Sequence, residues 1–356
     1  MSEKTSLRLD LMRWIAAGMV FVCHYSFLGY TGQPETALME MSRPWGLLGV
    51  AVFFVLSGYV IAYVAEAKHP DFRDYLRARL ARLYSVYIPA MIITLLLDLA
   101  GRACAASLYA GYPGIKFDTT VAKSIIFLIF FQENSLLSLR WMSNGPMWSL
   151  AYEFWYYIIF GVAYYFKSRL RAVMLPAVLL LAGWKILILM PIWLSGVLLY
   201  RFRQRFSGMS ARSRLGLGLA SATIIISLAT PSVFQWIEPW VSVGFRRMPP
   251  GFHAWFLFYY LALPALFGLV ASCIGEGSYR RNGVTRLIRW AAGFSFSLYL
   301  LHVPLIIFFR ALGVYDTGSL LQVLLFSVVI LAVIFGISLF TEKRKDLWSR
   351  WISRWV

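Results

Sequence analysis

The chain has 356 residues, of which 60% are hydrophobic and only 14% are charged. Because soluble domains carry about 25% charged residues, this composition excludes a water-soluble globular protein. Lys and Arg outnumber Asp and Glu by 34 to 16, which in a membrane protein first indicates basic cytoplasmic loops rather than a nucleic-acid partner.

About ten apolar segments are interpreted as membrane-spanning helices, since about 20 apolar residues cross the hydrocarbon core. An eleventh apolar run, 121–131, is too short to span at about 1.5 Å per residue, so we expect a re-entrant or surface-lying helix there. The predicted fold class is therefore all-α integral membrane. In chain order the ten segments cover about residues 9–30, 45–66, 82–101, 149–166, 172–184, 186–202, 214–230, 253–273, 293–311 and 319–340.

The positions of the basic residues orient this arrangement. With the N-terminus in the cytoplasm, 25 of the 34 Lys and Arg residues lie in segments that the ten spans would leave inside. We therefore expect both termini in the cytoplasm and a retained first span rather than a signal peptide. The domain organisation expected is one polytopic membrane domain over residues 1–341, followed by a short basic tail at 342–356.

Ionisable residues within apolar spans are costly, so each is a candidate for function. The first span carries Arg13 and, eleven residues later, His24. In a helix the two are about 20° apart in direction and roughly 16 Å apart along the axis, so they face one groove. An arginine near the surface can bind phosphate, and a deeper histidine can accept a proton near neutral pH. A snorkelling arginine and a hydrogen-bonded core histidine would explain the same spacing.

Small residues in the second span and arginines after it form the next candidates. Ser57 and Gly58 would let a neighbouring helix or a ligand approach closely. The cytoplasmic stretch 73–84 places Arg79 and Arg82 about one turn apart and contains arginine but no lysine. Arginine suits planar, bidentate phosphate recognition. Positive-inside topology alone would also account for these residues.

Two further clusters lie inside later spans. Glu153 lies about one turn into a span and needs a partner at that depth, for which a histidine or arginine is the obvious candidate. A carboxylate at the membrane boundary is the alternative. Ser295, Tyr299 and His302 are spaced i, i+4 and i+7, so one helical face carries three hydrogen-bonding side chains. That face could orient a catalytic imidazole or join packed spans.

Taken together, these segments resemble the type 3 membrane acyltransferase family, bacterial inner-membrane proteins that O-acylate sugars and other cell-surface or secreted molecules. The resemblance extends over nearly the whole chain, and five degenerate motifs in the family's order make it specific. Since the chain stops soon after its last span, it resembles the stand-alone form without a C-terminal hydrolase-like domain. The motifs are Arg8-Leu-Asp10-Leu-Met-Arg13 with His24, residues 50–58, Arg79-Leu-Ala-Arg82, Trp148-Ser149-Leu150 with Glu153, and residues 295–304.

The resemblance implies a multi-pass protein of the bacterial cytoplasmic membrane, surrounded by membrane lipids. It also implies a cytoplasmic acyl-CoA donor, commonly acetyl-CoA, and the hydroxyl of a carbohydrate or glycolipid as acceptor. No nucleic acid is expected as a partner. No metal is expected either, because Cys23, Cys104 and Cys273 lie far apart without metal-ligand spacing.

In that family an arginine and a histidine with this spacing in the first span are required for function. Our hypothesis makes His24 the general base on the acceptor hydroxyl, with Glu153 or His302 orienting it or sharing the proton. The supporting residues expected are Asp10, Ser57, Ser295 and Tyr299. The residues expected to hold the CoA phosphates are Arg13, Arg79 and Arg82.

Three alternatives stay open at this point. A side chain could carry the acyl group covalently before transfer, although Cys23 points about 100° away from its neighbour His24 in a helix. The same ionisable residues could form a proton-coupled path in a transporter or flippase for a lipid-linked sugar. An inactive relative that only binds export partners is the third.

Overall fold

The structure is a computed structural model that describes residues 1–29, 37–68, 71–111, 121–243 and 256–353. Over these residues the chain is all-α, as the sequence predicts, and one isolated bridge between Trp141 and Asn144 is the only β-type pairing there. Helices dominate because in hydrocarbon only a structure that pairs its own backbone groups is stable.

The chain divides into two compact units that interleave along the sequence. Unit 1 contains Met1–Val20, Glu40–Pro70 and Lys185–Ala292, and unit 2 contains Phe21–Met39, Asp71–Trp184 and Gly293–Val356. The first helix, α1 (Glu3–Leu28), contributes residues to both.

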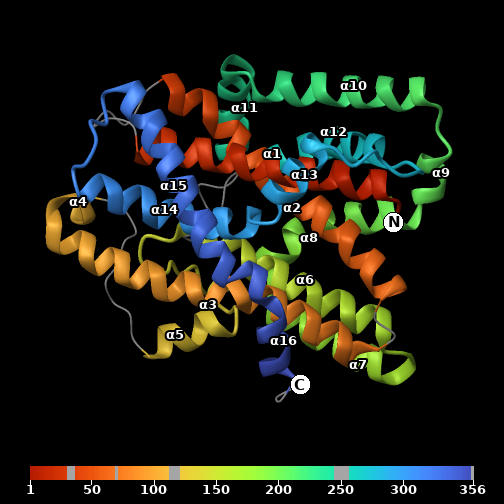
Figure 1. Cartoon of the computed structure of the whole chain (residues 1–356). Helices are drawn as coiled ribbons and strands as arrows, with labels where there is room; N and C mark the ends of the chain where they lie inside the picture. Colours follow the sequence, from red (N-terminus) through yellow and green to blue (C-terminus); the bar gives the residue numbers. More distant parts are fainter. Residues whose placement is uncertain (30–36, 69–70, 112–120, 244–255, 354–356) are drawn as a thin grey trace. The chain divides into compact units, whose positions relative to one another are not determined.

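Unit 1 holds a pair of adjacent helices, α10 and α12, which lie side by side (Figure 1). Helix α11 follows α10 after a bend of 70°. The helices that supply most of this unit besides α1 are α2 (Ala37–Ala67), α8 (Trp184–Arg201), α9 (Arg203–Ser207), α10 (Ala211–Ala229), α11 (Pro231–Val243), α12 (Phe256–Cys273) and α13 (Gly283–Ala292).

Two glycines allow α2 and α8 to touch through their backbones. A Cβ atom at Gly58 would clash with the carbonyl oxygen of Trp193, and one at Gly196 would clash with that of Val55. At the same contact the indole Nε1 of Trp193 donates a hydrogen bond of 3.1 Å to Ser57 Oγ. The small residues of the second span therefore serve helix packing, the first of the two roles that the sequence suggests.

Unit 2 is organised around α3, which packs against α14 and α16 (Figure 1). Helix α3 begins at an N-cap, Asp71, whose side chain accepts a hydrogen bond of 2.8 Å from the backbone N–H of Asp74. The elements are α3 (Phe72–Cys104), α4 (Ala106–Gly111), α5 (Val121–Leu128), the 3-10 helix η1 (Gly145–Met147), α6 (Trp148–Tyr165), α7 (Ser168–Ala182), α14 (Ser295–Ala311), α15 (Leu320–Phe340), the 3-10 helix η2 (Glu342–Arg344) and α16 (Lys345–Ile352).

Five helical stretches of the described chain are long and apolar enough to cross a membrane. The number rises to seven if α10 with α11, and α13 with α14, each form one bent span. A multi-pass membrane protein is therefore supported, whereas the count of ten spans and the cytoplasmic placement of the termini stay predictions. The five stretches are Glu40–Ala67, Phe72–Cys104, Trp184–Arg201, Phe256–Cys273 and Leu320–Trp351.

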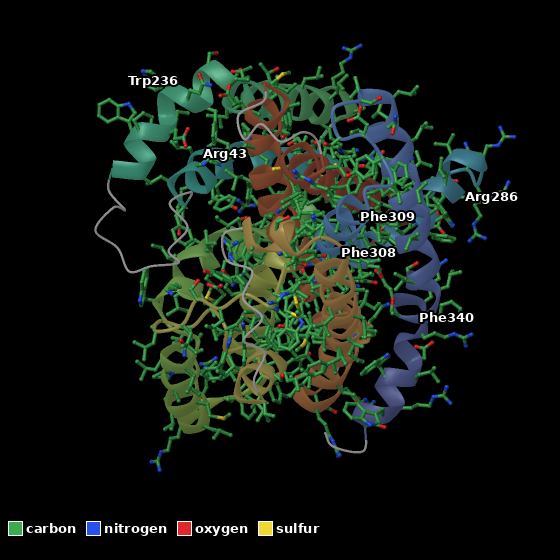
Figure 2. The ribbon with its side chains drawn as sticks, turned by 90° about the vertical axis from the view of Figure 1, so that its left-hand side faces the viewer. Arg43, Trp236, Arg286, Phe308, Phe309 and Phe340 are labelled. Atoms are coloured by element: carbon green, nitrogen blue, oxygen red, sulfur yellow. The ribbon has the colours of Figure 1, made fainter. Side chains whose placement is uncertain are left out.

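Large apolar side chains on the outside of the helices agree with a lipid environment. Phe340 of α15 is 76% exposed and Trp236 of α11 is 70% exposed, and Figure 2 shows both pointing away from their helices. Along α15, exposed leucines and valines accompany Phe340. Exposed apolar surface of this kind costs free energy in water but not in hydrocarbon.

Within the run 121–131, Val121–Leu128 forms the short helix α5, and the chain then continues without helix to residue 144. Part of this stretch is exposed, as at Leu136, which is 90% exposed, and part of it is buried. Gln132 is fully buried and its Nε2 donates to Tyr87 OH at 3.0 Å, while the indole of Trp141 donates to the Met91 carbonyl at 3.0 Å. The stretch is thus held against α3 by its own side chains.

The contact at Gly58 gives a test of this packing. We expect Gly58→Ala to lower the free energy of unfolding by about 1–3 kcal/mol, because the new methyl group must push the α8 backbone away. The control is Gly216→Ala in α10, where a Cβ atom would meet open space. That change should be neutral or stabilise by up to about 1 kcal/mol. Thermal unfolding of both variants in detergent measures the difference, and equal melting temperatures would contradict the close approach.

Candidate active site

Two histidines that are far apart in the sequence lie in contact within unit 2. The rings of His24 in α1 and His302 in α14 have centroids 4.9 Å apart and planes inclined at 67°. His302 is fully buried, and His24 is partly buried. The sequence named both residues separately and could not predict that they meet.

The hydrogen bonding of His302 fixes its tautomer. Its Nδ1 lies 2.8 Å from the backbone carbonyl of Leu298, one turn earlier in α14. A carbonyl oxygen only accepts hydrogen bonds, so Nδ1 carries the proton and the lone pair of the neutral ring is on Nε2. Nε2 is buried without a hydrogen-bond partner among the described residues. His302 is therefore an oriented ring with an unoccupied basic nitrogen.

A row of polar side chains leads away from this pair. The ring of Tyr299 is 6.3 Å from that of His302, and its hydroxyl lies 2.7 Å from Ser149 Oγ at the start of α6. Ser295 precedes Tyr299 by one turn and is also buried. The i, i+4, i+7 stripe of α14 thus lies inside the unit, and its tyrosine connects two helices.

The hydrogen-bond partner of Glu153 is a tyrosine, whereas the sequence analysis expects a histidine or an arginine. Tyr157, one turn later in α6, donates a hydrogen bond to the Glu153 carboxylate. Arg79 of α3 interacts electrostatically with Glu153 and Tyr157, and its Nε is buried without a hydrogen-bond partner. Arg82 is exposed. Arg82 also interacts electrostatically with Tyr157. Both members of the predicted arginine pair are therefore close to the Glu153–Tyr157 pair, with Arg79 partly buried and Arg82 exposed.

A second charged cluster lies in unit 1, around the start of α1. Asp10 accepts a hydrogen bond of 2.9 Å from Nη1 of Arg13 and another from Nη1 of Arg289 in α13. Nη1 of Arg289 also donates to Ser6 Oγ at 2.8 Å. The Asp10 carboxylate thus holds two guanidinium groups. No sequence pattern singles out Arg289, because only the fold brings it to Asp10.

Metal binding finds no support in the described residues, where no group of three or more His, Cys, Asp or Glu side chains could hold an ion. The chemistry available is that of imidazole, carboxylate, phenol and guanidinium groups. A buried imidazole with a free lone pair can accept a proton, and arginines can bind an anionic substrate. This set is suited to moving a proton from a hydroxyl group while an anionic partner is held nearby.

Comparison with known proteins agrees with this chemistry. The family model described as an acyltransferase domain matches residues 6–339. Acyltransferase MdmB of Streptomyces mycarofaciens is 29% identical over 156 residues, which cover 43% of this chain and 38% of that protein. An O-acetyl transferase of Shigella phage Sf6 is 30% identical over 159 residues, which cover 43% of this chain and 44% of that protein. Each match therefore covers less than half of the relative. No solved structure matches.

The substitution Asp10→Asn tests how much the two ion pairs of Asp10 contribute to stability. We expect Asp10→Asn to lower the free energy of unfolding by about 1–2 kcal/mol, because two partly buried guanidinium groups lose their counter-ion. Asp74→Asn is a matched control, since Asp74 binds Arg77 with the same i, i+3 spacing at 2.8 Å but is 40% exposed. It should cost about 0.5 kcal/mol or less. Thermal unfolding in detergent compares the two, and an equal cost would show that Arg289 adds nothing.

Proposed function

We propose, from the premise that the chain belongs to the type 3 acyltransferase family, that it transfers an acyl group from acyl-CoA to a hydroxyl group of a carbohydrate or glycolipid. The acyl group is proposed to be acetyl, which is what the name of the phage relative indicates for that protein. The contact between His24 and His302, with the free Nε2 of His302, is the observation that supports this function best. The chain is accordingly an acyltransferase of the bacterial cytoplasmic membrane in our proposal.

The proposed reaction uses the histidine pair as general base. Nε2 of His302 takes the proton of the acceptor hydroxyl while the hydroxyl oxygen attacks the thioester carbonyl. The carbon–sulfur bond then breaks, and the proton passes from the imidazole to the departing CoA thiolate. His24 was the base in the interpretation of the sequence alone. The structure favours His302 for this step, because its Nδ1 is held by Leu298 and its Nε2 is free.

The arginines are proposed to hold the donor. Coenzyme A has its phosphates at one end of a long flexible arm and its thioester at the other, so phosphate binding and catalysis occur at separate places. Arg79 has a buried Nε without a hydrogen-bond partner, and Arg82 is an exposed residue next to Tyr157. Arg13 keeps the phosphate-binding role that the sequence predicts, now with Asp10 and Arg289 beside it. Glu153 and Tyr157 would orient Arg79.

The histidines are tested first. Protein in inverted vesicles receives radiolabelled acetyl-CoA and cell-envelope material, and both label transfer and release of free CoA are measured. We expect His302→Gln to lower the rate about 10²–10⁴-fold, which is the usual contribution of a general base. His24→Gln should lower it as well, and the larger loss identifies the base.

Three results would count against this proposal. If folded His302→Gln and His24→Gln both transfer label like the wild type, the base is elsewhere. If the wild type neither transfers label nor releases CoA with several acyl donors, a proton-coupled transporter becomes the better interpretation. A labelled intermediate that survives on the protein after denaturation would indicate the covalent route instead.

Donor binding by Arg79 gives a separate prediction. Arg79→Gln should raise KM for acetyl-CoA about 10–100-fold, because a charge-assisted hydrogen bond to phosphate contributes about 1.5–3 kcal/mol. The control is Arg169→Gln, since Arg169 is exposed on α7 and also belongs to a basic segment. Its KM should stay unchanged. Initial rates of CoA release against acetyl-CoA concentration measure both, and an equal KM in the two variants would remove Arg79 from the donor site.

A further inference from the structure

Helix α14 lacks one backbone hydrogen bond at its buried centre. Pro304 lies inside the helix and has no N–H group, so the carbonyl of Leu300, four residues earlier, receives no bond from it. Leu300 is fully buried. A buried carbonyl without a partner costs free energy in any protein and cannot reach water within a membrane. The incomplete turn, residues 300–304, is the turn that carries His302.

The missing donor comes from the polar stretch between α5 and α6. Nδ2 of Asn144 donates a hydrogen bond of 2.8 Å to the Leu300 carbonyl and another of 2.9 Å to Thr94 Oγ1. Because a carbonyl only accepts, the atom facing Leu300 must be the nitrogen of the amide. Asn144 is fully buried. Its two N–H bonds are therefore both used inside the protein.

The neighbouring residue fastens the same stretch to α3. The Ser143 N–H and Oγ both donate to the Asp98 carboxylate at 2.8 Å. Thr94 and Asp98 are one turn apart on α3, so they present their acceptors on one face of that helix. Residues 143–144 are thus hydrogen-bonded to Thr94 and Asp98 of α3 and to the Leu300 carbonyl of α14.

We propose that Asn144 is a positioning residue for the reaction, which rests on the function proposed above. Its amide replaces the helical hydrogen bond lost at Pro304, and so fixes the turn of α14 that holds the His302 ring against His24. The sequence element His-x-Pro then has a physical purpose. The proline leaves one carbonyl near the histidine without its helical hydrogen bond. A side chain from another element then donates to that carbonyl and fixes the position of the turn.

A double-mutant cycle on stability tests the hydrogen bond itself. Asn144→Ala should lower the melting temperature by roughly 2–6 °C, because the Leu300 carbonyl loses its donor. Pro304→Ala restores an N–H group that can bind the same carbonyl, so Asn144→Ala should cost clearly less in the Pro304→Ala background. Tyr84→Phe is the control, since the Tyr84 hydroxyl donates to the Leu128 carbonyl at 2.7 Å, away from the Asn144–Leu300 bond, and its cost should be equal in both backgrounds. An equal cost of Asn144→Ala in both backgrounds overturns the proposal.

Activity tests the positioning role. Asn144→Ala should lower kcat for CoA release about 10–100-fold and leave KM for acetyl-CoA within about twofold, because the base is displaced while the donor site is intact. In the Pro304→Ala background, adding Asn144→Ala should lower kcat clearly less than it does in the wild type. A folded Asn144→Ala protein with wild-type kcat, or one whose KM rises with kcat unchanged, refutes positioning. If the wild type itself transfers no acyl group, the proposed function fails, and the stability cycle still decides the Asn144–Leu300 bond.

Discussion

Within a membrane, every buried polar group must find its partner inside the protein, and α14 shows how far this requirement shapes the site. The Leu298 carbonyl accepts a hydrogen bond from His302 Nδ1, and the Leu300 carbonyl accepts one from Asn144. A carbonyl oxygen has two lone pairs, so Leu298 can bind the ring without giving up its place in the helix. The orientation of the imidazole is therefore set by the backbone of the helix that carries it.

The same requirement explains the polar stretch between α5 and α6. Backbone without helical hydrogen bonds is tolerated at membrane depth only where it is buried in protein. Here long side chains supply the partners: Tyr84 OH donates to the Leu128 carbonyl at 2.7 Å, and Trp155 Nε1 donates to the Phe130 carbonyl at 3.0 Å. Both carbonyls lie where α5 ends and its internal hydrogen bonds stop. The aromatic residues of this region thus act as donors to an irregular backbone as well as apolar filling.

The sequence predicts contacts between residues of one helix, but not contacts between residues far apart in the chain. Periodicity within one helix placed Ser295, Tyr299 and His302 on one face and gave Glu153 a need for a partner. It could not predict that His24 meets His302, since the two are 278 residues apart and share no helix. Pro304 signals an unpaired carbonyl at Leu300, but no local pattern names Asn144 as its donor. Arg289 was missed for the same reason, because only the fold brings it to Asp10.

The geometry of the histidine pair disfavours a positive charge on both rings at once. Two unit charges 4.9 Å apart repel by about 3–4 kcal/mol at an effective dielectric constant of 20. A positive charge on one ring therefore opposes a second positive charge on the other ring. In the proposed reaction the base must be a neutral ring before each turnover. In the proposed reaction, a proton taken from the acceptor hydroxyl leaves the pair before the next cycle, and the thiolate released from the donor can receive it. In this proposal the histidine pair takes up the proton from the hydroxyl and then releases it to the thiolate.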